Sequence, residues 1–464
     1  MLRDRYEPVD LFALVPQLGL GFDPQLAQLD RLLDDDQIFA AVRADLARRY
    51  PLTPVHGRRS TPVEVILRML VVMRLYGWSY ERTAYFVNDS LVLRQFCRVY
   101  LEKVPADTTL IRWANTLGPA TLQKLNDRAV QLARAGKVTR GRKLRVDTTA
   151  VEADIHYPTD SALVGDGVRV VSRLLRRAKG ALGPAAAGLG RAFRSRVRTV
   201  RKLSQQLHRI ARHKGEEGRA ALKAAYTKLI AVARLTAAQG ERVRGALQRS
   251  AGEQALRLAA RLGEFLPRLR RGIDQASRRV LQGEAVPAPE KLLSLFEPHT
   301  QVIPRFKAGK PVEFGRKLRL DEVEGGIITG YAILDRGGGQ DQAYLKDSLA
   351  AHRRHFGRAP DLLAADRGMS SAANEALARE AGVKQVALPH VGKASVERKA
   401  LEKGRRFRRG YRFRAGIEGR IHVLRRDRGL KRCRYHGESG MGRWVGWGIV
   451  THNLSKVAEA GAAQ

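Results

Sequence analysis

Cysteine, acidic residues and long apolar runs are scarce in this sequence. Its 464 residues include only two cysteines, Cys97 and Cys433, which are too few for a disulfide framework or a four-thiolate zinc site. We therefore expect a reducing, cytosolic compartment. No run of 18 or more apolar residues occurs, and the first residues lack the charged, apolar and small segments of a signal peptide. These absences argue against a membrane-spanning or secreted protein.

Basic residues, by contrast, are abundant. The chain has 85 Lys and Arg against 46 Asp and Glu, a formal charge of +39, and 44% of its residues are hydrophobic. The apolar content is sufficient for folded cores, and at ~100–200 residues per domain the length suggests about three domains. A large positive excess repels itself unless a polyanion neutralises it, and nucleic acid and anionic membrane are the common cellular polyanions. Because the sequence has no amphipathic apolar anchor, we favour nucleic acid.

Short helices separated by turns are expected between residues 60 and 117. Residues 60–64, Ser-Thr-Pro-Val-Glu, supply an N-cap, a proline in the first turn and an acid at the positive end of a helix. This helix should end near Gly77, a second should begin at Ser79, and a third should follow residues 105–109. The pattern predicts a compact all-α module of the helix-turn-helix kind.

Strands alternate with helices in much of the remaining chain. Residues 143–151 are rich in β-branched side chains and predict a first strand. Further strands are expected at 317–320, 326–334, 362–366 and 383–388, a glycine turn at 337–339, and helices at 342–356 and 371–381. This alternation predicts a mixed α/β domain that a long segment interrupts.

The interrupting segment, residues 168–280, contains 28 Lys or Arg and six Asp or Glu. Apolar residues at three- and four-residue steps, as between Val197 and Ile210, predict amphipathic helices in a hairpin or small bundle. A solvated coiled coil, the alternative, usually mixes both charge signs in i,i+4 pairs. The single-sign charge favours contact with the phosphate backbone of DNA.

Three acidic residues lie where a scaffold could present their side chains. Asp147 lies on the first strand, Asp366 ends a later strand, and Glu418 lies in a helix expected to begin near Tyr411. Carboxylates repel one another at close range unless a cation lies between them. Oxygen ligands without His or Cys favour Mg²⁺ or Mn²⁺ over zinc. We therefore expect these three residues to form a divalent metal site.

Other acidic residues are weaker candidates. They are Glu152, Asp154, Asp335, Asp341, Asp361 and Glu438. Asp335 and Asp341 flank the glycine turn, where capping is the expected role, and Glu438 lies among Gly and Ser outside any expected helix. None of them has the basic helical surroundings of Glu418.

The expected helix around Glu418 carries further polar groups on one face. Tyr411, Arg414, Glu418 and Arg425 are offset by three, seven and fourteen residues, so they lie on one side of a helix. That side would present a carboxylate for a metal beside two guanidinium groups and a phenol, which suits a phosphodiester next to a cation. An exposed basic helix in an Arg-rich protein is the alternative.

This spacing of Tyr, Arg, Glu and a basic residue resembles the signature of bacterial insertion-sequence transposases of the DDE class, in the broad group of the fourth and fifth insertion-sequence families. Arg425 stands where the family more often has Lys. Val-Asp-Thr-Thr at 146–149 resembles the family's first-Asp strand, and Ala-Asp-Arg-Gly at 365–368 resembles its second-Asp motif. Residues 60–117 are similar to the family's N-terminal helical domain.

The resemblance implies an α/β fold with a ribonuclease-H-like catalytic core. Asp147 would lie on its first strand, Asp366 after its fourth strand and Glu418 on the following helix. Mg²⁺ (or Mn²⁺) held there would activate a water or a DNA 3′-hydroxyl and stabilise the leaving oxygen. Nicking at the element's end and transfer of the strand to target DNA would follow. The DNA-binding residues would be Tyr411, Arg414, Arg425 and Arg367.

We expect three parts: an N-terminal helical DNA-binding domain at 1–135, the catalytic core at 140–165 and 300–458, and a basic helical insertion at 166–299. The implied partner is double-stranded DNA, both the terminal inverted repeats and the target, bound by a homodimer or larger assembly in the bacterial nucleoid and not at a membrane. The competing functions are a structure-specific nuclease or resolvase and a non-catalytic nucleic-acid-binding protein.

Overall fold

The computed structural model describes residues 1–48, 56–213, 215–250, 252–307, 310–335 and 344–463. The chain divides into two compact units: Met1–Ala153 with Arg316–Gln464, hereafter the first unit, and Asp154–Gly315, the second unit. The three-part division into 1–135, 140–165 with 300–458, and 166–299 stays a prediction. No helix among the described residues is long and apolar enough to cross a membrane.

The N-terminal part of the first unit is all-α, as predicted. Its helices are α1 Pro24–Leu33, α2 Asp36–Ala47, α3 Val63–Leu75, α4 Tyr80–Asp89, α5 Leu91–Phe96, α6 Asp107–Thr116 and α7 Pro119–Ala135. The Ser79 hydroxyl accepts a hydrogen bond from the Arg82 backbone N–H at 3.2 Å, which confirms it as the N-cap of α4. Helix α3 is buried on nearly all sides because α2, α4, α6 and α16 pack around it.

A mixed sheet forms the centre of the α/β part. Its strands are β1 Lys143–Glu152, β2 Gln301–Lys307, β3 Lys310–Val323, β4 Ile327–Ile333, β5 Leu362–Ala365 and β6 Gln385–Ala387. The order is β2-β3-β1-β5-β6, and β4 also pairs with β3. The β1–β5 and β5–β6 pairs are parallel, whereas β3 is antiparallel to β2 and β4. The predicted α/β class is confirmed; β2 was not predicted, and β6 is shorter than expected.

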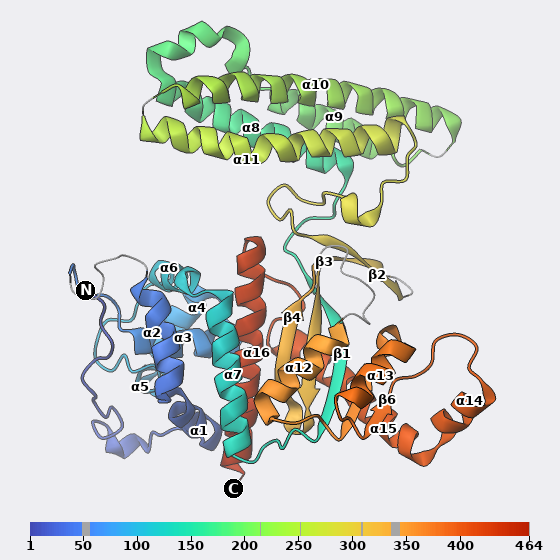
Figure 1. Ribbon diagram of the computed structural model, residues 1–464. Coiled ribbons are helices and arrows are strands. Elements are labelled where there is room, and N and C mark those ends of the chain that lie inside the picture. The colour runs from blue at the N-terminus through green and yellow to red at the C-terminus, as the bar shows by residue number, and fades with distance from the viewer. Residues whose placement is uncertain (49–55, 214, 251, 308–309, 336–343, 464) are drawn as a thin grey trace. The chain divides into compact units, whose positions relative to one another are not determined.

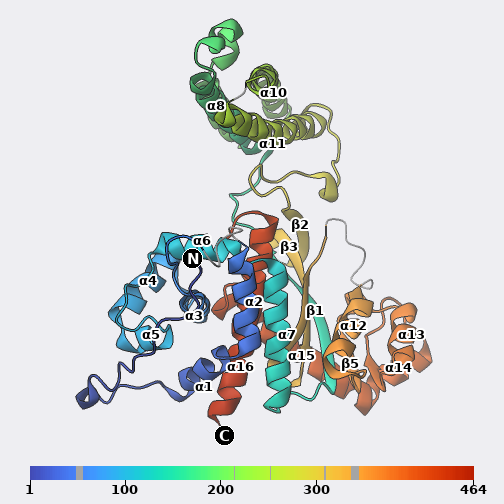
Figure 2. The same ribbon diagram turned by 60° about the vertical axis from the view of Figure 1, so that its left-hand side comes forward.

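Helices cover both faces of this sheet. They are α7, α12 Leu345–Phe356, α13 Ala372–Glu380, α15 Arg405–Asp427 and α16 Gly437–Ala462; helix α14 Val396–Lys403 packs on α15. Leu144 and Val146 of β1 share an apolar core with residues of α7, α12, α13 and α16. Helices α7 and α16 lie side by side next to β4 (Figures 1 and 2). Strand alternation turns Arg145 and Asp147 to the other face, which α15 covers.

Two sequence expectations about the C-terminal helices are wrong. Helix α15 begins at Arg405 and not near Tyr411, because the Arg-rich residues before Tyr411 favour helix and Gly404 lies at the N-cap. Glu438 lies in the first turn of α16, where an acid is favourable, and contacts Arg316 at 2.8 Å. The glycine turn and Asp341 lie outside the described residues.

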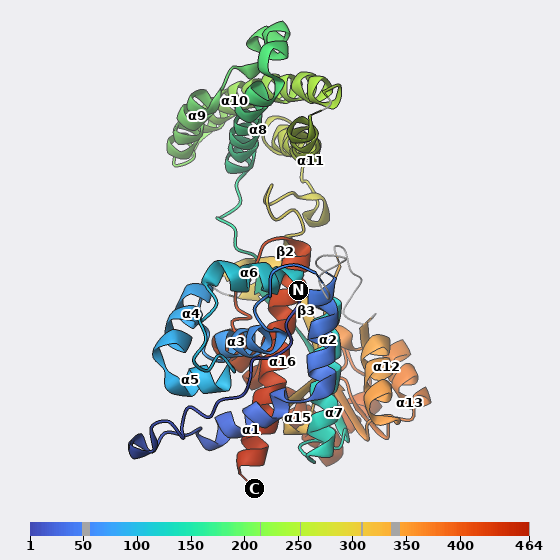
Figure 3. The same ribbon diagram turned by 90° about the vertical axis from the view of Figure 1, so that its left-hand side faces the viewer.

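The second unit is built mainly from helices that pack side by side (Figure 3). They are α8 Asp160–Leu182, α9 Val197–Ile210, α10 Glu216–Gln248 and α11 Glu253–Ala276. Their apolar residues form one core, and the backbones approach closely where glycine faces a partner helix, as at Gly167 beside Leu269. The insertion therefore forms a helical bundle with its basic residues largely outside, as the apolar spacing predicted.

Three histidines, His352, His355 and His452, are buried in the described part of the first unit, and burial lowers the pKa of each. Burial lowers the pKa of His452 to about 3 and the pKa of His352 to about 4. The Nε2 atom of His452 lies 3.0 Å from the backbone oxygen of Gly326. A histidine in the unfolded chain has a pKa of about 6.5, so the unfolded state binds these protons first as the pH falls. Their contribution to stability is therefore complete above about pH 6.5 and decreases progressively below it.

We expect the free energy of unfolding to fall by about 1.4 kcal/mol per pH unit for each histidine between about pH 6 and pH 4. His452→Gln should remove one histidine's share of that slope, because glutamine keeps an N–H donor for Gly326 and does not titrate. Urea denaturation followed by circular dichroism measures the slope, with the exposed His390→Gln as control. An unchanged slope in His452→Gln would contradict the assignment.

Candidate active site

One face of β1 presents polar residues to α15. The Arg145 guanidinium donates to the backbone oxygen of Phe413 at 2.6 Å and lies 4.7 Å from the centre of its ring. The Lys143 ammonium lies 5.7 Å from the same ring. Asp147, two residues beyond Arg145, consequently faces α15 as well. Strand β1 thus places the carboxylate of Asp147 against α15, which carries several arginines.

A buried ion-pair network fixes α15 in this place. Glu322 of β3 is fully buried. It accepts from Arg145 at 2.6 and 2.8 Å and from Arg420 of α15 at 3.1 Å. Two guanidinium groups therefore neutralise one carboxylate shared by two strands and the helix. The sequence motifs do not indicate this network, although a charged residue between apolar neighbours, such as Arg145 between Leu144 and Val146, is a signal of a buried ion pair.

Glycines allow α15 to lie close to the sheet. A Cβ atom at Gly410 would come within 2.8 Å of the Cβ of Ala387 on β6, closer than side-chain carbons approach. A Cβ at Gly416 would overlap the Arg145 guanidinium. Gly410 thus requires a residue without a side chain, whereas a side chain at position 416 would displace the Arg145 guanidinium. The close approach brings the polar side of α15 to Asp147.

Three carboxylates from distant parts of the chain meet at the guanidinium of Arg414. Its Nη2 atom lies 3.0 Å from Asp147 Oδ2 and 3.6 Å from Asp366 Oδ1, and its Nη1 atom lies 2.9 Å from Glu418 Oε1. The Asp147 side chain is 9% exposed, that of Asp366 48% and that of Glu418 68%. The cluster therefore has a buried floor and an open side. The three acids selected from the sequence lie together.

The pKa values in the cluster depend on burial and on the charge of the Arg414 guanidinium that the carboxylates share. Burial raises the pKa of Asp147 to about 6; the carboxylates of Asp366 and Glu418 add to this, and Arg414 opposes it. Burial opposes the charge of Arg414, but the three carboxylates outweigh burial and raise its pKa above the usual value. The site thus holds more negative charge than one guanidinium neutralises.

The donor set fits a hard divalent cation in kind. It consists of three carboxylates without His or Cys, the ligands that Mg²⁺ and Mn²⁺ prefer. Backbone N–H groups of Thr148 and Arg367 donate to the Oδ1 atoms of Asp147 and Asp366 and orient both groups. In the described part of the chain, no three acidic, His or Cys side chains are placed to hold a metal as they stand. Arg414 lies between the carboxylates, so an ion would need it to withdraw.

The other residues selected as DNA contacts lie around this cluster in different ways. Tyr411 and Arg367 are exposed and line one hollow of about 350 Å³, together with residues of α15. Arg425 instead donates to the backbone oxygen of Ala150 at 2.8 Å and lies 3.4 Å from the Thr149 hydroxyl. Arg425 therefore connects the C-terminal half of α15 to β1.

The alternative acids have other contacts. Asp361 pairs with Lys384 at 3.0 Å. The Glu152 backbone bonds to Lys431 and Cys433, and Asp335 lies 3.6 Å from Arg316. No ion pair recorded among the described residues joins one of these acids to Arg414, in contrast to the three selected carboxylates.

Two segments of the chain match known family models. Residues 20–116 match a family described as "Transposase domain (DUF772)", and residues 321–454 match the "Transposase DDE domain". The second match includes Asp366 and Glu418, whereas Asp147 precedes it. No curated protein and no solved structure matches the chain significantly.

Glu322→Gln tests whether the buried network holds the site together. The variant keeps the shape of the buried side chain but leaves two partly buried guanidinium groups without their carboxylate. We expect the free energy of unfolding to fall by about 3 kcal/mol, as measured by urea denaturation. Glu397→Gln, at an exposed position of α14, is the matched control. A loss below about 1 kcal/mol, typical of surface pairs, would argue against a central role for Glu322.

Proposed function

From the two matched domains we infer that the chain is an insertion-sequence transposase of the DDE class. Such a protein is a metal-dependent enzyme that acts on DNA. We propose that this chain belongs to the broad group of the fourth and fifth insertion-sequence families. It binds the terminal inverted repeats of its element, cleaves a DNA strand at the element's end and joins that end to target DNA. The observation that carries this proposal is that Asp147, Asp366 and Glu418 all lie at the guanidinium group of Arg414.

A ribonuclease-H-like core is part of the proposal. The strand order β4-β3-β1-β5-β6, with parallel β1, β5 and β6 and an antiparallel β3–β4 pair, supports it. Without β2, Asp147 lies on the first strand and Asp366 directly follows the fourth. Glu418 lies on α15, which packs on the face of the sheet that carries Asp147. These positions agree with those expected from the family.

The proposed roles follow from charge and exposure. Asp147, Asp366 and Glu418 would hold the divalent metal, Mg²⁺ or Mn²⁺. Bound metal supplies activation of a water or a 3′-hydroxyl and stabilisation of the leaving oxygen. Arg414 keeps the carboxylates together in the free protein and turns to the DNA phosphate when the cation replaces it.

Further residues would bind and orient DNA. Tyr411 and Arg367 lie at the open hollow beside the cluster and would position the strand. Arg425 would act mainly by holding α15 on β1. The N-terminal helices would recognise the repeats, with phosphate contacts providing most of the affinity. Work on two ends requires at least a dimer on DNA, and the site of action would be the bacterial nucleoid.

Substitution of the carboxylates tests the chemistry. Asp147→Asn, Asp366→Asn and Glu418→Gln should each lower the rate of Mg²⁺-dependent cleavage of the element's ends by about 10³-fold or more. Duplex binding should remain, because the lost charges are negative. Gel electrophoresis of a plasmid that carries both ends measures nicking, excision and strand transfer.

Asp347→Asn is the control, since Asp347 is an exposed acid of the same unit on α12, and its carboxylate lies 3.6 Å from Arg319 and not at Arg414. Cleavage without joining in the wild type would favour a nuclease or resolvase. Binding without cleavage, unaffected by the three substitutions, would favour a non-catalytic DNA-binding protein and would refute the proposal.

The role of Arg414 can be tested without DNA or catalysis. Arg414→Gln should raise the affinity of the free protein for Mn²⁺ about 10-fold, because the competing guanidinium is gone. Titration followed by electron paramagnetic resonance measures free Mn²⁺. Arg412→Gln removes the same charge from an exposed neighbouring position and serves as control. Equal affinities in Arg414→Gln and the control would show that Arg414 does not compete with the metal.

A further inference from the structure

A basic hollow of about 640 Å³ lies in the first unit, away from the carboxylate cluster. It is found where β1, β5 and β6 begin and where α15 starts. Strands β1 and β5 pair over Lys143–Val146 and Leu362–Ala365. Asp147 and Asp366, in contrast, follow the last paired residues and lie at the other end of this segment. The basic residues that line the hollow are Arg142, Lys143, Lys384, Arg405, Arg406 and Arg409.

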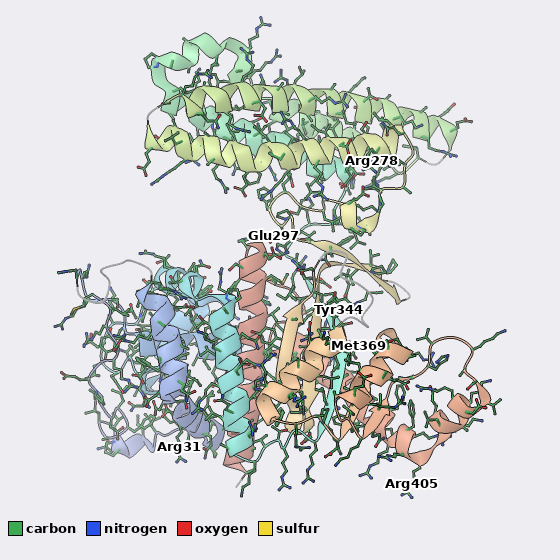
Figure 4. The ribbon with its side chains drawn as sticks, in the orientation of Figure 1. Arg31, Arg278, Glu297, Tyr344, Met369 and Arg405 are labelled. Carbon is green, nitrogen blue, oxygen red and sulfur yellow. The ribbon has the colours of Figure 1, made fainter. Side chains whose placement is uncertain are left out.

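The charge of this hollow is poorly compensated by the protein. Asp361 is the acidic residue in its lining, and it already pairs with Lys384, which lowers its pKa, and with Arg358. Within the described parts of the chain, Arg405 and Arg409 have no ion-pair partner, and both are exposed. Figure 4 shows the side chain of Arg405 at the start of α15. Such a cluster repels itself until an anion binds.

The cations are attached to a fixed framework. The Gln385 side chain of β6 donates to the backbone oxygen of Arg406 at 2.6 Å, and Gly410 packs on Ala387 of the same strand. The Phe413 ring forms an apolar wall beside Lys143. The beginning of α15 adds the partial positive charge of a helix amino terminus. The arrangement is thus set by strands and a helix, and six spread cations suit successive phosphates better than one small anion.

Two paths give the same separation between the hollow and the proposed cleavage site. From Lys143 to Asp147 the strand advances four residues, about 13 Å at about 3.3 Å per residue. From Arg409 to Glu418 the helix advances nine residues, about 13.5 Å at about 1.5 Å per residue. Since a DNA strand rises about 3.4 Å per base, this distance corresponds to about four nucleotides.

We propose that the hollow is a phosphate clamp for the DNA duplex being cut, holding backbone phosphates about four nucleotides from the scissile bond. The proposal rests on the proposed function, because the register is counted from Asp147, Asp366 and Glu418. The clamp would fix how far the strand enters the site and would therefore position the scissile phosphate. It reads the phosphate backbone and not the bases.

Phosphate ethylation interference on end-binding DNA, combined with the salt dependence of binding, tests the clamp. The test variant replaces Arg405, Arg406 and Arg409 with Ala; the control replaces Lys346, Arg353 and Arg354, exposed on α12 of the same unit, with Ala. Ethylation about four nucleotides from the cut should weaken binding to wild type and control but not to the test variant. The logarithm of the association constant decreases with the logarithm of the salt concentration. This dependence should become less steep by about 2–3 in the test variant alone, because each lost phosphate contact removes about 0.9 from the slope.

A thermal melt checks that the variants fold, and Arg405→Glu at the exposed first helical position is a second test variant. It should reproduce the loss of interference at the same phosphates. An unchanged interference pattern in both test variants, while the wild type cleaves its ends, overturns the clamp and leaves the proposed function intact. Equal slopes for the test variant and the α12 control also overturn it. Absence of cleavage by the wild type refutes the proposed function, and with it the register of the clamp.

Discussion

The structure of the candidate active site depends on one buried carboxylate. Glu322 of β3 neutralises Arg145 of β1 and Arg420 of α15, and this shared ion pair holds the helix on the sheet. Burying these charges is costly unless all of them are paired, so the helix has few alternative positions. Because Arg414 lies less than two turns before Arg420 on α15, the same constraint brings its guanidinium to Asp147.

The interface between the sheet and α15 therefore follows one electrostatic pattern. Arginines of α15 contact carboxylates on or next to the strands at two places: Arg420 contacts Glu322, and Arg414 contacts Asp147 and Asp366. At Glu322 the charges are enclosed and compensated. At Arg414 three carboxylates share one guanidinium on the solvent side. Removing one partner from the enclosed network would leave charges unpaired, whereas we propose that the excess negative charge of the open cluster attracts a divalent cation.

Local sequence signals predicted local features. The three carboxylates were selected from their expected places at strands and a helix, and the family resemblance then supported the selection. Ser79 as a helix cap and the first strand at 143–151 depend on nearby residues, and both are confirmed. A charged residue between apolar neighbours indicates that Arg145 is paired, but its partner Glu322 lies 177 residues away and Arg420 lies a further 98 residues along the chain, so the local pattern could not identify the partners. The start of α15 was placed too late because the Arg-rich segment from Arg405 was not recognised as helix.

Charged residues are distributed unevenly over the helical bundle of the second unit. This distribution bears on whether the insertion contacts DNA or is a solvated coiled coil. On α11 the acids Glu253 and Glu264 pair with nearby arginines, as in a solvated coiled coil. On α8 no acid follows Asp166, yet basic residues recur through Lys179. An exposed helix surface of one charge sign is unfavourable in isolation. The DNA-binding interpretation, which stays a proposal, therefore depends on α8 and on α9, which has basic residues and no acid. The apolar core that the helices share accounts for the packing of the bundle.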